Sequence, residues 1–282
     1  MLSVRKADAP IRALWKITAA SVTACTMNAV RKDRIGAAFG AAADGYERHA
    51  GVQRTAAITL ADLAGLLALP PRPRILEIGC GTGLLTREIQ ARWPDADLLV
   101  TDLSPAMVGK AAEGGMVAGT FLPMDGERPW FEGAWFDLIL SSLTFQWFDD
   151  LGEAIGRQVA LLRPGGSLLF STMAERSFAS WRAAHAACGL VGGTPAYPSL
   201  DAVRAMIGGY ADAFAFDEDY PLECGDARGL LRHLKGIGAA IPAEGRAPLS
   251  PGDLRRVMRV FDDAGARDAY HVVFARVTRI ET

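Results

Sequence analysis

The chain contains few of the residues that build metal centres and disulfide frameworks. Its 282 residues include four cysteines and four histidines. No pair of cysteines has metal-ligand spacing or the pattern of a small disulfide scaffold, and the histidines form no H-x-x-x-H or H-E-x-x-H array. We therefore expect a reduced, cytoplasmic protein that uses no metal.

Strong charge of one sign and long apolar runs are also missing. The formal net charge is −2, and 22% of the residues are charged while 50% are hydrophobic. This composition is typical of globular domains and excludes a strongly basic nucleic-acid binder. No run of 18 apolar residues exists, so the sequence predicts no membrane span.

The N-terminal region divides into two expected segments ahead of the main domain. Residues 13–27 are mildly apolar behind several basic residues, a pattern that can mimic a targeting peptide. Met27 is a more natural start, so we expect residues 1–26 to be a disordered or mis-started extension. We expect a helical lid over residues 27–70 and the main domain over residues 71–282.

The strongest pattern is a strand, glycine turn, helix and second strand that ends in an acid. Glycines let a backbone bend sharply and approach a ligand closely. Parallel α/β sheets bind nucleosides at such a turn, and the final acid is placed to accept hydrogen bonds from two ribose hydroxyls. The parts, in chain order, are an apolar run at 74–78, Gly79, Gly81, Gly83, a helical pattern over 84–93, an apolar run at 98–101, and Asp102.

The acid that precedes these glycines decides between two nucleoside cofactors. Glu77 stands two residues before Gly79, where it would repel a pyrophosphate but suit a cationic amino group. The E-x-G-x-G-x-G pattern, with Asp102 nineteen residues after Gly83, resembles the class I methyltransferases. That resemblance implies S-adenosylmethionine as the cofactor.

The rest of the chain fits an α/β fold of that class. The resemblance implies a Rossmann-like sheet of seven strands with the last one antiparallel, a helical N-terminal lid, and a helical insertion at about 225–265. The other expected strands are 116–122, 135–142, 167–173 (after a tight turn at 163–166), 214–222 and 268–277. The expected helices are a stretch at 31–50 broken by glycines, 52–69, one opened by Pro105, 151–162, 177–189, 201–207, 227–236 and 251–264.

Several residues near expected strand ends extend the predicted cofactor site. Asp125 follows the third strand and is placed to accept from an adenine amino group, although it also suits a turn. The predicted cofactor-binding set is Glu77, Gly79, Gly81, Gly83, Asp102, Leu103, Asp125, Gly126 and Ser142.

Three further stretches carry a more specific resemblance. Residues 41–53, 141–147 and 233–239 together resemble the malonyl-[acyl-carrier protein] O-methyltransferases of biotin synthesis, and the segment LKGIGA is the most specific piece. The resemblance implies methyl transfer to the free carboxylate of a malonyl thioester, on acyl carrier protein or coenzyme A. A carboxylate is ionised at pH 7 and needs no general base.

The acceptor side is therefore expected to position its substrate. We predict that Tyr46, Gln146 and Trp147 lie beside the methyl group and that Arg176 grips the malonyl carboxylate through paired N–H groups. The alternatives are a surface tyrosine, a capping amide, a packed indole and a solvated arginine, respectively. Lys235 is placed either to meet substrate or carrier phosphate or to be exposed.

The charge distribution suggests where an acidic carrier would dock. Residues 224–282 hold ten Lys or Arg against seven Asp or Glu, whereas residues 55–223 hold eleven against twenty-one. Scatter over solvated faces is the alternative explanation. The basic residues form two clusters on expected helices, namely Arg228, Arg232 and Lys235, then Arg255, Arg256 and Arg259. We expect a monomer that contacts neither nucleic acid nor membrane.

Three other functions remain open on the sequence alone. The Phe-Gln-Trp segment is shared with small free-acid methyltransferases of the trans-aconitate type. A related assembly factor of a respiratory complex, thought to hydroxylate arginine, has a different pattern where this chain has LKGIGA. A cofactor-binding scaffold without turnover is the non-enzymatic alternative, against which the intact glycines and acids argue.

Overall fold

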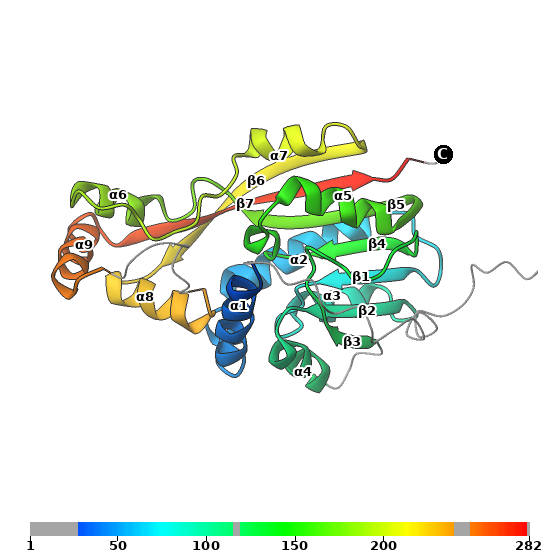
Figure 1. Ribbon diagram of the computed structural model, residues 1–282, viewed down its shortest axis with the longest axis horizontal. Coiled ribbons are helices and arrows are strands. Elements are labelled where there is room, and N and C mark those ends of the chain that lie inside the picture. Colours follow the sequence, from blue (N-terminus) through cyan, green and yellow to red (C-terminus); the bar gives the residue numbers. More distant parts are fainter. Residues whose placement is uncertain (1–27, 115–118, 240–248, 281–282) are drawn as a thin grey trace, which may run out of the picture.

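The computed structural model describes residues 28–114, 119–239 and 249–280, and a single seven-stranded sheet forms its centre (Figure 1). The spatial order is β3-β2-β1-β4-β5-β7-β6. Strands β1 to β5 pair in parallel, and β7 pairs antiparallel with both β5 and β6. The predicted seven-stranded sheet with an antiparallel last strand is thus confirmed. The strands are β1 (Arg74–Ile78), β2 (Asp97–Asp102), β3 (Thr120–Pro123), β4 (Phe136–Ser141), β5 (Leu162–Met173), β6 (Ala211–Glu223) and β7 (Arg267–Thr278).

Helices cover both faces of this sheet, and several begin where the sequence supplies a cap. Five of them follow a Ser or Asp whose side chain accepts a backbone N–H of the first turn, which satisfies a donor that has no partner within the helix. These caps are Ser104, Asp150, Ser199, Asp226 and Ser250. The helices are α1 (Asn28–Ala42), α2 (Gly51–Gly65), α3 (Leu84–Arg92), α4 (Pro105–Glu113), α5 (Leu151–Leu161), α6 (Ala179–Ala187), α7 (Leu200–Ile207), α8 (Ala227–Gly236) and α9 (Pro251–Asp263), with short 3-10 turns at η3 (Tyr46–Arg48) and η4 (Phe145–Trp147).

The strands that hold the site are buried on both faces. Every residue of β1 is buried, and its alternate side chains join two apolar cores. Ile75 packs in the core that includes α2 and α3, whereas Leu76 and Ile78 pack in the core that includes α5 and α7. A loop that leaves such a strand is held firmly in place.

The N-terminal stretch follows the prediction in part. Residues 31–50 were expected to be broken by their glycines, and a turn at 43–45 that contains Gly45 does separate α1 from η3, but α1 runs unbroken through Gly36 and Gly40. These glycines instead allow a close contact with the chain around α4. A Cβ on Gly40 would lie 3.0 Å from the Ser104 Oγ, and one on Gly36 would lie 3.6 Å from Leu103. Tertiary packing outweighs the low helix propensity of glycine here.

The remaining differences are local. The third strand was predicted at 116–122; residues 115–118 lie outside the described ranges, and β3 covers Thr120–Pro123. The tight turn at 163–166 belongs to β5 as a register irregularity against β4. The extension predicted for residues 1–26 also lies outside the described ranges. No helix within those ranges is both long and apolar enough to cross a membrane.

The pair β6–β7 carries the helical insertion. Figure 1 shows this pair reaching beyond the parallel strands, with α6, α8 and α9 on the extension and α8 beside α1. The insertion therefore lies on the same side of the molecule as α1, which stands at one end of the parallel strands.

Candidate active site

A cavity of about 670 Å³, its opening to solvent included, lies where the parallel strands end. Its walls come from α1, from η3 and from the loops that follow β1, β2, β3 and β4. The lining includes nine residues predicted for the site: Tyr46, Gly79, Gly81, Asp102, Leu103, Asp125, Gly126, Ser142 and Trp147.

Glycine is required at the first turn of this cavity. Gly79 has a φ of 72°, and a Cβ there would lie 2.0 Å from the Thr144 hydroxyl oxygen. The loop after β4 therefore closes against the loop after β1 only because no side chain intervenes. The amides of Gly79 and Cys80 donate to the Thr101 carbonyl at 2.8 and 2.9 Å, which fixes the turn onto β2.

Asp102 holds the glycine loop and also faces the cavity. Its Oδ2 accepts from the Gly81 amide at 2.9 Å and its Oδ1 from the Ser104 amide at 2.8 Å. Burial raises the pKa of Asp102, while these two hydrogen bonds oppose the rise. A carboxylate has about four acceptor positions, so two remain for a ligand. This arrangement fits the two hydroxyls of a ribose.

Glu77 is a fully buried acid whose carboxylate is poorly satisfied. Neither oxygen meets strict hydrogen-bond geometry with any described residue, and its hydrogen-bonding neighbour is Thr86. Burial raises the pKa of Glu77 to about 8, while the hydroxyl and backbone amide of Thr86 and the charge of Arg87 oppose the rise and the charge of Asp102 adds to it. Glu77 lies behind Ile78 and Gly79, which line the cavity, and is not itself on the lining. A buried acid left unsatisfied is unusual, and it fits the cationic amino group of S-adenosylmethionine.

A lysine that the sequence reasoning missed holds the opposite end of the cavity. Lys32 on α1 donates to Asp125 Oδ1 at 3.0 Å and to Glu127 Oε2 at 2.7 Å. Burial alone would raise the pKa of Glu127, but Lys32 and the backbone amides of Asp149 and Asp150 keep it below its usual value. One oxygen of Asp125 is thus already used, and Oδ2 remains for an adenine amino group.

The turn η3 is fastened to the glycine loop. Glu47 Oε1 accepts from the Thr82 hydroxyl at 3.1 Å and from Arg87 at 2.8 Å, and Oε2 accepts from Arg54 at 3.0 Å. These contacts lie next to Tyr46, whose phenol lines the cavity and whose pKa is raised by burial. Tyr46 therefore stays a neutral hydroxyl held over the cavity.

The loop after β4 supplies the third wall. Leu143 has a φ of 49°, uncommon for a non-glycine residue, and its amide donates to the Ser171 hydroxyl at 3.0 Å. Trp147 packs edge-on against Phe39 of α1, with ring centroids 5.3 Å apart. The Gln146 amide donates to the Leu143 carbonyl at 2.6 Å and does not line the cavity.

Two further predicted residues lie outside the cavity lining. Gly83, with a φ of 90°, caps the start of α3. Arg176 lies between the outer strands, where its guanidinium pairs with Asp217 at 2.9 Å and Asp219 at 3.1 Å. Because its guanidinium is already engaged in these two ion pairs, we do not assign Arg176 to the site.

Comparisons with known proteins agree with this geometry. A family model described as a methyltransferase domain matches residues 48–207. Two solved structures share the fold. The YcgJ protein of Bacillus subtilis has a TM-score of 0.56 at 14% identity, covering 79% of this chain and 99% of that one. A phosphoethanolamine N-methyltransferase of Haemonchus contortus has a TM-score of 0.51 at 18% identity, covering 79% and 52%.

Curated relatives match more of the chain and at higher identity. A malonyl-[acyl-carrier protein] O-methyltransferase of Magnetococcus marinus is 37% identical over 257 residues, covering 88% of this chain and 93% of that protein. The biotin biosynthesis bifunctional protein BioCD of Bordetella avium is 44% identical over 239 residues, covering 84% of this chain. The chain spans 50% of the length of that bifunctional protein.

Proposed function

Because the chain belongs to the malonyl-[acyl-carrier protein] O-methyltransferase family of class I methyltransferases, we propose that it methylates the free carboxylate of a malonyl thioester. The methyl donor is S-adenosylmethionine, and the thioester is carried by acyl carrier protein or coenzyme A. The product is the malonyl methyl ester used in biotin synthesis. The observation that carries the proposal is the likeness to the Magnetococcus marinus enzyme, which covers almost all of both chains.

The cavity supports this chemistry through what its residues hold. Bound S-adenosylmethionine supplies a methyl group on a cationic sulfur. We propose that Asp102 and Asp125, which line the cavity, accept from its ribose and adenine. Glu77, buried behind the lining, is proposed to attract its amino group. The acceptor carboxylate is already an anion at neutral pH, so no proton has to be removed.

The remaining work of the protein is alignment and exclusion of water. No histidine or cysteine is found among the described residues that line the cavity. Tyr46, Phe39 and Trp147 instead line it with aromatic rings, and Trp147 packs edge-on against Phe39. Orientation of two bound reactants can supply a large share of the rate of a simple displacement.

The carrier protein is proposed to dock on α8 and α9. Acyl carrier proteins are strongly acidic, and α8 and α9 are neighbouring helices with exposed basic side chains. In Figure 1, α8 lies beside α1 and α9 lies beyond it at the end of the molecule. Arg256 is paired with Asp253 at 2.6 Å. Arg228, Arg255 and Arg259 form none of the ion pairs found among the described residues, so their charges are available to a partner.

The proposed reaction is tested with a panel of acceptors. Purified protein and S-adenosylmethionine with a labelled methyl group are incubated with malonyl-carrier protein, malonyl-coenzyme A, malonate and trans-aconitate. We expect label in the two thioesters and little in the free acids. Label in the free acids alone would favour a small-acid methyltransferase, and cofactor binding without any transfer would favour a scaffold.

The docking surface is tested by charge reversal. A variant with Arg228, Arg255 and Arg259 changed to Glu should raise the KM for malonyl-carrier protein about tenfold, with an effect that fades as salt rises. Malonyl-coenzyme A brings no acidic protein surface and should react as before. Reversal of Arg72 and Arg204, which are exposed elsewhere, is the control. An equal rise in KM for malonyl-carrier protein and malonyl-coenzyme A would overturn the docking assignment.

A further inference from the structure

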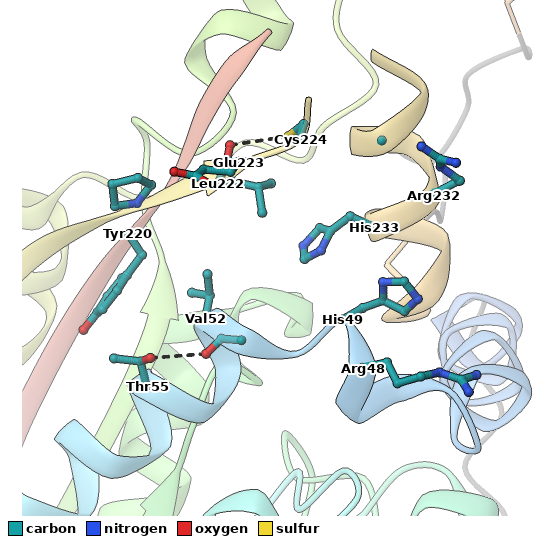
Figure 2. Close-up of a pocket in the computed structure, with 13 residues that line it drawn as sticks. Arg48, His49, Val52, Thr55, Tyr220, Leu222, Glu223, Cys224, Arg232 and His233 are labelled. Atoms are coloured by element: carbon teal, nitrogen blue, oxygen red, sulfur yellow. Dashed lines mark hydrogen bonds between the residues drawn. The ribbon is translucent and has the colours of Figure 1, made fainter. Parts of the chain in front are cut away.

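A second cavity lies beside the active site, between the start of α2 and the β6–α8 connection (Figure 2). It encloses about 1350 Å³, its open mouth included. Its chemistry is mixed, with two arginines, two histidines and an apolar side. The residues that line it are Arg48, His49, Gly51, Val52, Thr55, Tyr220, Pro221, Leu222, Glu223, Cys224, Gly229, Arg232 and His233.

The two cavities share one wall. Tyr46 at the start of η3 lines the active-site cavity, whereas Arg48 at its end and the adjoining His49 line the second cavity. A molecule seated in the second cavity therefore has only this three-residue turn between it and the active site.

The segment LKGIGA fastens α8 to the same wall. A Cβ on Gly236 would lie 2.4 Å from the His49 ring, so the imidazole packs directly on the helix backbone. Gly238 has a φ of 71°, and a Cβ there would lie 2.9 Å from the Phe39 Cα on α1. Glycine at both positions lets α8, η3 and α1 meet closely, and this fixes the second cavity beside the first.

The inner polar groups of the second cavity suit binding more than reaction. His233 Nε2 and the Tyr270 hydroxyl are 2.7 Å apart, and burial lowers the pKa of His233 to about 4, which leaves it neutral. Burial raises the pKa of Cys224 to about 11, so its thiol is not ionised at neutral pH. The neutral imidazole of His233 can form hydrogen bonds of the kind that amide groups accept and donate.

Two arginines provide positive charge on this cavity. Arg48 and Arg232 come from opposite walls, both are exposed, and neither takes part in an ion pair found among the described residues. Figure 2 shows the rings of His49 and His233 lying between these arginines, while Val52 lies farther along the cavity. The lining thus offers positive charge on both sides of the imidazoles and an apolar side chain at Val52, with the carboxylate of Glu223 on β6 as the one acid among its described residues.

Resting on the proposed function, we propose that this second cavity binds the 4′-phosphopantetheine arm of the malonyl thioester. The arm carries a phosphate, two amides and a branched apolar segment, and each has a counterpart on the lining. Arg48 and Arg232 pair with the phosphate, because guanidinium groups bind phosphate oxygens through charge-assisted hydrogen bonds. The malonyl end passes η3 to reach Tyr46 in the active-site cavity.

The contact between the arginines and the phosphate is tested by removing either the two guanidinium groups or the phosphate. The variant Arg48→Ala/Arg232→Ala is compared with the wild type on malonyl-phosphopantetheine and on malonyl-pantetheine, which lacks the phosphate. We expect kcat/KM for the phosphorylated acceptor to fall at least tenfold, through KM, and that for malonyl-pantetheine to stay unchanged. Arg72→Ala/Arg204→Ala is the matched control and should leave both acceptors unaffected. An equal change for the two acceptors would overturn the proposal.

The two natural sources of the arm give a second comparison. Malonyl-carrier protein and malonyl-coenzyme A both carry 4′-phosphopantetheine, so the KM of each should rise in the double variant. A rise for the carrier protein alone would show that these arginines contact the carrier surface, which contradicts the proposal. Wild-type protein that methylates no malonyl thioester would overturn the proposed function itself.

Blocking the cavity gives an independent measurement. Thr55 lies exposed on α2 at the cavity, so Thr55→Trp fills space without disturbing the core. Methylation of malonyl-phosphopantetheine should be largely lost while binding of S-adenosylhomocysteine, measured by calorimetry, stays at the wild-type level. Full activity in this variant would show that the arm lies elsewhere.

Discussion

Glu77 should release a proton when the cofactor site is filled. Its carboxyl is fully buried, has the groups of Thr86 as weak hydrogen-bonding neighbours, and has its pKa raised by burial to about 8. At pH 7 a group with that pKa is about nine-tenths protonated. A cationic amino group placed against it favours the ionised form. We therefore expect about 0.9 proton to leave the protein for each cofactor bound at pH 7.

The same linkage sets the pH dependence of affinity. Only the ionised carboxyl pairs with the amino group, so affinity follows the ionised fraction of Glu77. Affinity should therefore rise as the pH increases from 7 toward the pKa of Glu77, and fall again at the alkaline pH where the amino group of the ligand loses its proton. Stability without cofactor decreases with pH. The folded-state pKa lies above the ordinary value of 4.5 for a glutamate, so ΔG of unfolding should fall by up to about 1.4 kcal/mol per pH unit from there to about pH 8.

Calorimetry measures the released proton directly. S-adenosylhomocysteine has the same amino acid tail and cannot react, so it is the appropriate ligand. Its binding enthalpy at pH 7 is measured in buffers of different ionisation enthalpy, and the slope gives the number of protons released. Glu77→Gln keeps the shape but cannot ionise, so its slope should be near zero. A zero slope in the wild type would refute the pairing of Glu77 with the amino group.

Three further substitutions follow from the contacts described above. Asp102→Asn should weaken S-adenosylhomocysteine binding by about 1–3 kcal/mol, measured by calorimetry, because an amide replaces one acceptor oxygen; unchanged affinity would contradict the ribose assignment. Gly236→Ala should cost about 1–3 kcal/mol of stability in urea unfolding, and His49→Ala should restore much of it; simple additivity would argue against their contact. Lys32→Met should cost about 3–5 kcal/mol because the buried carboxylate of Glu127 loses the cation paired with it and keeps two backbone amides; an unchanged melting curve would contradict this.

Residues close together in the chain made much of the active site predictable. The glycines after β1, the acid at the end of β2 and the acid after β3 each follow an apolar run, and parallel strands bring their carboxyl ends to one edge. Asp102 and Asp125 were therefore placed by local pattern together with one topological rule. The LKGIGA glycines carried a family resemblance, but their contacts with His49 and α1 became clear only in three dimensions.

Side-chain contacts between residues far apart in the chain could not be predicted from local sequence patterns. Lys32 is separated from Asp125 by 93 positions, and nothing in the local sequence distinguishes it from an exposed lysine. Arg176 follows a strand at the expected edge, which suggested a role in the site. The neighbouring β6 supplies Asp217 and Asp219, and their charges determine where that guanidinium points. The second cavity forms where α2, β6 and α8 come together, and no single stretch of sequence predicts that arrangement.

The central claim is that a carboxylate oxygen of a malonyl thioester accepts the methyl group. The most direct measurement is carbon-13 NMR of the product made from malonyl-carrier protein and methyl-labelled S-adenosylmethionine. We predict a single new methoxy signal of an ester, which mild alkali removes while the malonyl acid returns. A signal from a methyl on the central carbon of the malonyl group, or on the carrier protein itself, would contradict the account.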